Sequence, residues 1–240
     1  MSVTTRIQEL NNRLATNLVS KGVSAEGTET TTELINKVND IESGGTSVIN
    51  PEWTDWRYFS YYDNRNDLVA RLKYSDTANG KNFSNMFYAC SSLTTIPQLD
   101  TSNGTNFGAM FNGCSALTSI LQLSTSNGTN FNGMFSACTA LTTISLLNMS
   151  SMSGTSCINM FYNCTALENV TFEGTIPVRG NITVFSTCPN LTVESLMSFI
   201  NALTNMSDTA TYTITIGSTN LAKLTEEQIQ IATDKRITLQ

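Results

Sequence analysis

The segment MFYACSSLTTIPQLDTSNGTNF (86–107) is followed by a near copy, MFNGCSALTSILQLSTSNGTNF (110–131). The copies then become weaker, through MFSACTALTTISLLNMSS (134–151) and MFYNCTALENVTFEG (160–174) to VFSTCPNLTVESL (184–196). A cysteine marks the same place in each copy, at positions 90, 114, 138, 164 and 188, so the period is 24 residues with one step of 26. A fixed period in this range is typical of a solenoid, because one unit cannot bury its apolar face alone whereas stacked units can.

Within one copy, the apolar residues that we expect to point inward recur every three residues: Phe111, Cys114, Leu117, Ile120 and Leu123. The first steps have the spacing of a helical or 3₁₀ turn, and the stretch after Leu117 is short and compatible with a strand. The Asn-Gly pairs at 103–104 and 127–128 are interpreted as turns in which glycine accepts a positive φ. Phe107 and Phe131 are expected to close their coils.

The repeated phrase resembles the BspA-like leucine-rich repeat, a variant common in bacterial surface proteins and phage-encoded proteins. The resemblance covers about residues 68–196 and implies an adhesive or structural solenoid with no catalytic residues at these positions. The flanks, residues 1–38 and 213–239, are similar to segments that flank such repeats in phage and prophage virion proteins.

We therefore predict an α+β repeat protein, a leucine-rich-repeat solenoid of about four to five coils with additions at both ends. The predicted parts are a helical attachment or oligomerisation segment (1–45), an aromatic entrance cap (46–67), the solenoid (68–190) and an α/β C-terminal cap (191–240).

The N-terminal segment reads as two short amphipathic helices, the second opened by a capping box at residues 30–33. Their apolar stripe, spaced at three and four, is Ile7, Leu10, Leu14, Leu18, Leu34, Val38 and Ile41. Helices this short are marginal alone in water, so the stripe needs a partner. That partner is either other virion proteins and sister chains, as in a homo-oligomer such as a trimer, or the solenoid of the same chain.

An aromatic cluster precedes the repeats and holds both tryptophans of the chain. Two interpretations stay open. The rings of Trp53, Trp56, Tyr61 and Tyr62 form a stacking platform for the sugars of a host glycan, or they form the cap that covers the open end of the first coil.

The C-terminal segment is predicted to be the opposite cap. Thr192 opens a helix whose apolar residues are Leu196, Phe199, Ile200 and Leu203. Tyr212, Ile214 and Ile216 alternate as in a strand, residues 225–228 form a capping box, and residues 237–239 form a final strand. The charged residues expected to face solvent here are Glu226, Glu227, Asp234, Lys235 and Arg236.

The periodic cysteines are interpreted as small apolar groups of the core. The chain has no histidine and no CxxC pair, so a zinc site is not expected, and the parallel side chains of stacked coils do not favour disulfides. Cys157 is interpreted as lying outside the period. We predict no metal and no cofactor.

Charged residues make up 13% of the chain, about half the usual share, and Asp100 is the single charged residue from Asn82 through Leu167. The solenoid surface is therefore expected to be Ser, Thr, Asn and Gly. The absence of a basic stripe argues against nucleic acid and against an anionic membrane surface as partners. No stretch is apolar enough to span a bilayer, and the first twenty residues lack the apolar core of a signal peptide.

An enzyme is not expected, because the chain has no histidine base and no Walker, GxGxxG or GxSxG motif. The carboxylates nearest the solenoid entrance read as turn and cap residues: Asp55, Asp63, Asp67, Asp76 and Asp100. The sequence predicts a non-enzymatic bacteriophage structural protein, a head fibre, tail fibre or decoration protein. It would assemble into the virion in the host cytoplasm and adhere to a host glycan or protein. The alternative is a bacterial cell-surface adhesin of the same repeat class.

Overall fold

The computed structural model describes residues 54–56, 77–205 and 210–240. The chain divides into two units, Met1–Pro51 and Glu52–Gln240, and every described residue belongs to the second. The predicted apolar stripe of residues 1–45 lies outside the described residues, as do Trp53, Tyr61 and Tyr62 of the aromatic cluster.

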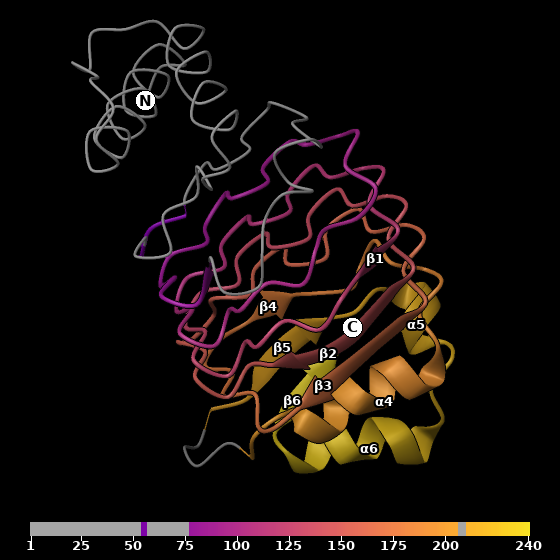
Figure 1. Cartoon of the computed structure of the whole chain (residues 1–240). Coiled ribbons are helices and arrows are strands. Elements are labelled where there is room, and N and C mark those ends of the chain that lie inside the picture. Colours follow the sequence, from indigo (N-terminus) through magenta and orange to yellow (C-terminus); the bar gives the residue numbers. More distant parts are fainter. Residues whose placement is uncertain (1–53, 57–76, 206–209) are drawn as a thin grey trace, which may run out of the picture. The chain divides into compact units, whose positions relative to one another are not determined.

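Successive repeats lie side by side and are joined by main-chain hydrogen bonds at a fixed offset (Figure 1). The N–H of Phe83 donates to the carbonyl of Asn106 at 2.8 Å, and the N–H of Phe107 donates to the carbonyl of Asn130 at 2.9 Å. The same links start from residues 85, 87 and 89 and recur in the next two coils, as far as the N–H of Ala137. Since the Asn106 carbonyl and the Phe107 N–H belong to one peptide group, each column is a chain of aligned dipoles, in which the bonds strengthen one another.

Between these columns the chain makes a run of tight turns. The N–H of Cys114 donates to the carbonyl of Phe111 at 3.0 Å, and the N–H of Leu117 donates to that of Cys114 at 3.1 Å. These bonds confirm the predicted three-residue spacing. In each coil two residues, four positions apart, have a positive φ in the left-handed region. They are Asn85, Ala89, Ala109, Gly113, Gly133, Ala137, Asn159 and Asn163. Such backbone favours glycine and asparagine, so the run excludes bulky residues at these positions.

The predicted reason for the Asn-Gly turns is wrong. Gly104 and Gly128 are not left-handed. A Cβ on Gly104 would instead overlap the ring of Phe107, three residues later, and would lie 2.9 Å from the Thr101 carbonyl oxygen. Glycine is therefore required by the space that the phenylalanine ring occupies, a contact that a turn pattern in the sequence does not reveal.

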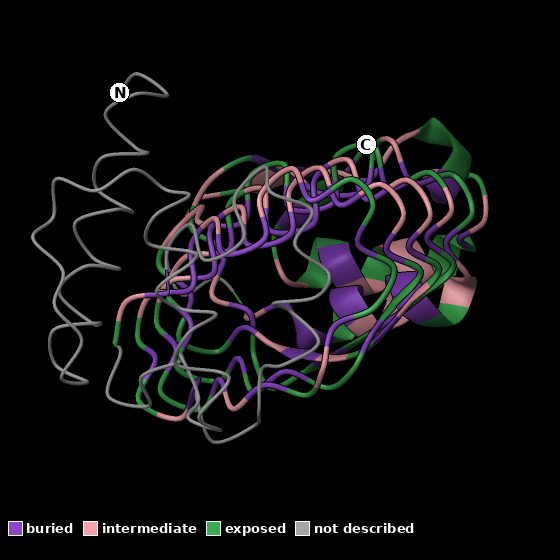
Figure 2. Cartoon of the chain, turned by 45° about the horizontal axis from the view of Figure 1, so that its top comes forward, coloured by how far each residue is buried: buried purple, intermediate pink, exposed green. Residues whose placement is uncertain are grey.

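Two columns of phenylalanine rings fill the centre of the stack. Phe83, Phe107 and Phe131 stack with centroids 5.7 Å apart at each step. The second column consists of Phe87, Phe111, Phe135, Phe161 and Phe185, with centroids 5.2–5.6 Å apart. These rings are completely buried. Figure 2 shows buried residues in purple along the inner side of the coils.

A short parallel sheet runs along one side of the stack in the order β1 (Ser119–Ile120), β2 (Thr143–Asn148) and β3 (Asn169–Glu173). The register places Ser119 beside Thr143 and Thr143 beside Asn169, so equivalent residues of successive coils are neighbours. Helix α4 (Val193–Ala202) takes the place of the next strand and packs against β3 (Figure 1).

Two serines of α4 pair with the outer edge of β3. Ser195 Oγ accepts from the N–H of Val170 at 3.0 Å, and Ser198 Oγ accepts from the N–H of Phe172 at 2.8 Å. A strand edge with unpaired N–H groups would invite another chain to pair with it. The helix therefore ends this sheet without leaving those two amides open.

A second parallel sheet, in the order β4 (Ile182–Thr183), β5 (Tyr212–Thr215) and β6 (Ile237–Leu239), continues the stack at the C-terminal end. Helix α5 (Ser218–Leu221) follows β5, and α6 (Glu226–Asp234) precedes β6. The predicted helix cap at Thr192, the capping box of Thr225 and Gln228, and the strand at 237–239 are confirmed.

Lys235 was expected to face solvent, and that prediction is wrong. Its Nζ donates to the carbonyl oxygens of Ile200, Asn201 and Leu203 at 3.0, 2.7 and 2.7 Å. The ammonium group thus satisfies the open carbonyls and the negative dipole end of α4. Its partial burial lowers the pKa of Lys235.

Parallel sheets and stacked coils are observed in the described residues, whereas their assignment to the leucine-rich-repeat class stays a prediction.

The role of glycine beside the phenylalanine column can be tested within the chain itself. In the fourth coil Cys157 replaces phenylalanine and Gly154 has open space around its Cβ position, with a φ of +58°. We expect Gly104→Ala to destabilise the fold by about 2–3 kcal/mol through overpacking, and Gly154→Ala by about 1 kcal/mol through backbone strain. Urea unfolding would measure both changes. In a Phe107→Cys background the additional effect of Gly104→Ala should shrink, and an undiminished effect would contradict the ring contact as its cause.

The serine pairing of β3 gives a second prediction. Ser198→Ala leaves the N–H of Phe172 without its partner and should destabilise the fold by about 1–3 kcal/mol. Hydrogen exchange at Phe172 should become faster, whereas Ser145→Ala, on the exposed side of β2, should change stability by less than about 0.5 kcal/mol. Unchanged exchange at Phe172 would show that the serine does not protect the strand edge.

Candidate functional site

The outer surface of the stack is polar and almost free of charge over the first coils. Many exposed positions that recur at the repeat interval carry serine, threonine or asparagine, as in Ser102, Asn103 and Thr105 and their counterparts Ser126, Asn127 and Thr129. Other exposed positions of the described coils carry Gln98, Gln122, Leu121, Ile158 and Tyr162. Figure 2 shows exposed residues in green along the outer bends of the coils. The predicted Ser, Thr, Asn surface is therefore present in part.

The exposed side chains are not independent of one another, because they form ladders from coil to coil. Thr105 Oγ1 donates to the Lys81 carbonyl and Thr129 Oγ1 donates to the Thr105 carbonyl, both at 3.1 Å. Asn103 Nδ2 donates to the Ala78 carbonyl and Asn127 Nδ2 to the Ser102 carbonyl, both at 2.7 Å. Each ladder fixes the rotamers of the side chains that it contains, so the surface is held in one arrangement.

Further ladders follow the side that leads into the β1–β3 sheet. Thr142 Oγ1 donates to the Thr118 carbonyl at 3.2 Å, and Thr139 Oγ1 donates to the Ser115 carbonyl at 3.3 Å. In every one of these bonds the donor belongs to the later coil and the acceptor to the earlier coil. The side-chain bonds of the polar surface therefore all point toward the N-terminal coils. The N–H groups of the peptide columns point the other way, toward the C-terminal coils.

Asp100 is the one carboxylate of the early described coils, and it has a structural partner. One of its oxygens accepts from the N–H of Ser102 at 3.0 Å and from the Ser102 hydroxyl at 2.6 Å. This is the turn chemistry predicted for it. Asp55, the other described member of the predicted carboxylate set, lies beside Asn82 in a parallel bridge, and Asp63, Asp67 and Asp76 lie outside the described residues.

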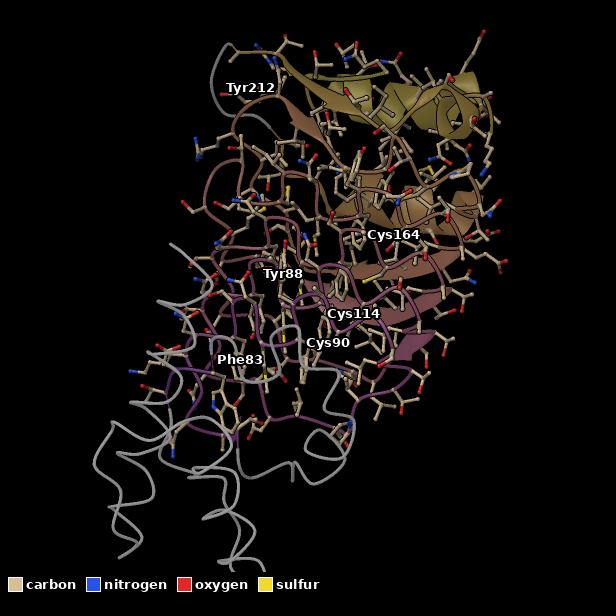
Figure 3. All side chains as sticks on the ribbon, turned by 90° about the horizontal axis from the view of Figure 1, so that it is seen from above. Phe83, Tyr88, Cys90, Cys114, Cys164 and Tyr212 are labelled. Carbon is tan, nitrogen blue, oxygen red and sulfur yellow. The ribbon has the colours of Figure 1, made fainter. Side chains whose placement is uncertain are left out.

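The cysteines are free and buried, which confirms their assignment to the core. Cys90, Cys114 and Cys164 lie inside the stack in Figure 3. The structure adds a contact that the sequence did not predict. The thiols of Cys114, Cys138, Cys164 and Cys188 each donate to a phenylalanine carbonyl of the preceding coil, at 3.0, 3.1, 2.9 and 3.0 Å. Cysteine is thus the small residue that also satisfies this buried carbonyl.

Cys157 does not lie outside the period, and that prediction is wrong. The N–H of Phe131 donates to the carbonyl of Ser156 at 2.7 Å, as the N–H of Phe107 does to that of Asn130. Cys157 therefore occupies the register of Phe107 and Phe131, and it is completely buried there. The two-residue insertion before the fourth coil hides this equivalence when cysteines alone are aligned.

The thiols are poor nucleophiles in this setting. Burial raises the pKa of Cys138 and that of Cys157 to about 12. The pKa of Cys114 is also raised, first by burial and then by the neighbouring thiols Cys138 and Cys90. Reactive cysteines have lowered pKa values, so these thiols fit packing rather than catalysis. Among the described residues, no three His, Cys, Asp or Glu side chains are grouped as metal ligands.

The structure removes one of the four residues predicted to form the sugar platform. The side chain of Trp56 is completely buried, and its main-chain N–H donates to the Asn82 carbonyl at 2.7 Å. Its indole ring therefore offers no face to a ligand. Trp53, Tyr61 and Tyr62 lie outside the described residues, so for them the platform stays a prediction.

Residues 57–173 match the model of a family described as "Mycoplasma protein of unknown function, DUF285", a family associated with BspA-like surface repeat proteins. The matched segment contains the first described coils and ends at the last residue of β3. The searches of curated proteins and of solved structures each gave no match. Within the described residues, no helix is both long and apolar enough to cross a bilayer.

The buried thiols predict how stability depends on pH. A thiol whose pKa is about 12 in the folded chain and 9.0 when unfolded stabilises the fold below pH 9, and this contribution is lost between pH 9 and 12. Stability should therefore fall above pH 9, by about 1.4 kcal/mol per pH unit for each such thiol. Chemical unfolding at a series of pH values would measure the slope.

Cys138→Ala provides the matched comparison, because it should be less stable at neutral pH yet lose less stability per pH unit above 9. A thiol reagent at neutral pH should leave the folded chain unmodified and react after unfolding. Reaction of Cys138 in the native chain, or an unchanged alkaline slope in the variant, would contradict this account.

Proposed function

We propose that the chain is a non-enzymatic structural protein of a bacteriophage particle, a head fibre, tail fibre or decoration protein. In this proposal the stacked coils are a leucine-rich-repeat solenoid that projects from the particle and adheres to the host surface. The observation that carries the proposal is the fixed, uncharged surface of laddered side chains around Thr105 and Thr129. Such a surface offers many weak contacts and no reactive group.

The weakness of single contacts bears on the assembly. One neutral hydrogen bond contributes about 0.5–1.5 kcal/mol net, so adhesion through this surface needs many bonds and many copies. Multiple copies on one particle would supply avidity without any new contact. We therefore propose a symmetric homo-oligomer, a trimer being one arrangement, joined to other virion proteins through the apolar stripe of residues 1–45.

The alternative is a bacterial cell-surface adhesin, and a specific observation favours it. The matched family is associated with surface repeat proteins of the BspA-like kind. The virion proposal is supported instead by the flanks 1–38 and 213–239, which resemble segments beside such repeats in phage and prophage virion proteins.

Immunogold labelling of purified phage particles separates the two. The virion proposal expects label at regular sites on the particle, on the capsid for a head fibre or decoration protein and on the tail for a tail fibre. The adhesin alternative expects loss of the protein when intact uninfected bacteria are treated with a protease. Unlabelled particles together with a protease-sensitive protein on uninfected cells would replace the first proposal by the second.

The attachment role of the apolar stripe has its own test in the full-length chain. Leu10→Asp combined with Leu14→Asp should lower the mass measured by light scattering to that of a monomer and abolish incorporation into particles. An oligomer of unchanged mass that still joins particles would show that the stripe packs against its own chain.

A further inference from the structure

The exposed corner of the coils has a hydrogen-bonding character that its composition alone does not reveal. We define the corner surface by the residues Asn103, Thr105, Asn127 and Thr129. Each of them is exposed, and each donates a side-chain hydrogen to a carbonyl of the preceding coil. The hydroxyl hydrogen of Ser102 is also occupied, but within its own coil, since it donates to the carboxylate of Asp100.

What remains on the outside of this surface is a set of oxygen lone pairs. Each threonine has a single hydroxyl hydrogen, and the ladder uses it. The hydroxyl oxygens of Thr105 and Thr129 can then only accept from a ligand. The amide oxygens of Asn103 and Asn127 also accept, and each asparagine keeps one further amide hydrogen. A ligand that contacts the two threonine oxygens must therefore bring hydrogen-bond donors, while each asparagine can still donate one hydrogen and accept another.

The distribution of charged residues indicates whether the ligand is neutral or charged. Carboxylates outnumber basic groups among the described residues, the carboxylates being Asp55, Asp100, Glu168, Glu173, Glu194, Glu226, Glu227 and Asp234. Two of the few basic groups are already occupied. Lys235 binds the carbonyls at the end of α4, and Lys223 Nζ donates to the carbonyls of Pro189 and Leu191 at 2.6 and 2.7 Å. The corner itself carries little charge, since Lys81 is the exposed counterpart of Thr105 in the preceding coil and Asp100 lies beside Ser102. A sulfated, phosphorylated or carboxylated polymer would therefore meet acceptors and, among the described coils, no cluster of basic groups.

The spacing of the corner residues gives the shape of the ligand. Asn82, Asn106 and Asn130, which flank the corner, form a continuous series of parallel bridges. Neighbouring parallel strands lie about 4.8 Å apart, so equivalent acceptors repeat at about that interval along the stack. One sugar residue in an extended polysaccharide has a comparable length, and it carries several hydroxyl donors.

We propose that the corner surface binds a neutral, hydroxyl-rich polysaccharide that lies along the stack, with sugar hydroxyls donating to the Asn Oδ1 and Thr Oγ1 atoms of successive coils. This inference rests on the proposed adhesive function and names the ligand class for it. Binding is additive over the coils, insensitive to salt and dependent on polymer length, because the contacts are uncharged and individually weak.

The test uses the full-length chain and affinity electrophoresis through gels that contain one soluble polysaccharide at a time. The neutral probes are a glucan, a mannan, a galactan and a soluble N-acetylglucosamine polymer, and the charged probe is the carboxymethylated form of the same glucan. Thr105→Val with Thr129→Val keeps the side-chain shape and removes both acceptors, whereas Thr105→Ser with Thr129→Ser keeps them. Thr94→Val with Thr118→Val is the matched control away from the corner.

At least one neutral polymer should retard the wild-type chain, equally at low and high salt, and the carboxymethylated glucan should not. The valine pair should bind about tenfold more weakly, since it loses two acceptors, while the serine pair and the control pair should bind as wild type. Melting temperatures of all variants show whether a lost interaction reflects lost folding.

Two results would overturn the inference. One is the absence of retardation by every neutral polymer, and the other is retardation that the valine pair does not change in a folded chain. Either result, together with labelled particles, leaves the proposed virion role standing. Polymer retention with unlabelled particles would leave this inference standing and remove the virion role.

Discussion

The structure depends on peptide groups that bond to their own equivalents one coil away. The N–H of Phe107 and the carbonyl of Asn106 belong to one peptide and face opposite neighbours, so every coil must follow the same path as the last. Within the bonded segment this constraint places each side chain beside its own counterpart, and the one step of 26 residues is accommodated outside it. A coil gains little alone, because both its main-chain partners and its apolar contacts lie in adjacent coils.

Because each side chain packs against the same residue type in the next coil, only some side chains are tolerated in the repeat. Aromatic rings, thiols, hydroxyls and amides tolerate a copy of themselves at this distance, and the phenylalanine columns show it at 5.2–5.7 Å. Two like charges about 5 Å apart repel by about 3 kcal/mol at an effective dielectric of 20. The near absence of charge from Asn82 through Leu167 therefore follows from the stacking itself. The adhesive surface that we propose makes use of a neutrality that the fold already requires.

Features that repeat or follow local rules could be predicted from the sequence. The buried cysteines, the three-residue turns, the cap at Thr192 and the strand at 237–239 all rest on spacing or on local capping chemistry. Features that depend on a partner distant in sequence could not. The ring of Phe107 above Gly104, the hold of Lys235 on the end of α4, and the place of Cys157 in the phenylalanine register all come from contacts between coils or elements. The acceptor character of the corner surface belongs to the same class, because composition does not show where a hydroxyl hydrogen points.

The direction of the bonds makes the two ends of the stack different. In the peptide columns N–H groups point toward the later coils, so the C-terminal end must satisfy donors, and Thr187 Oγ1 accepts from the N–H of Asn163 at 2.6 Å there. On the β3 side the serines of α4 receive two more N–H groups. Another chain cannot add to the stack through these N–H groups, because they already donate to side-chain hydroxyls. The repeated surface that remains available to a ligand is the flank of the coils, and at the corner the oxygens of Thr105 and Thr129 can only accept.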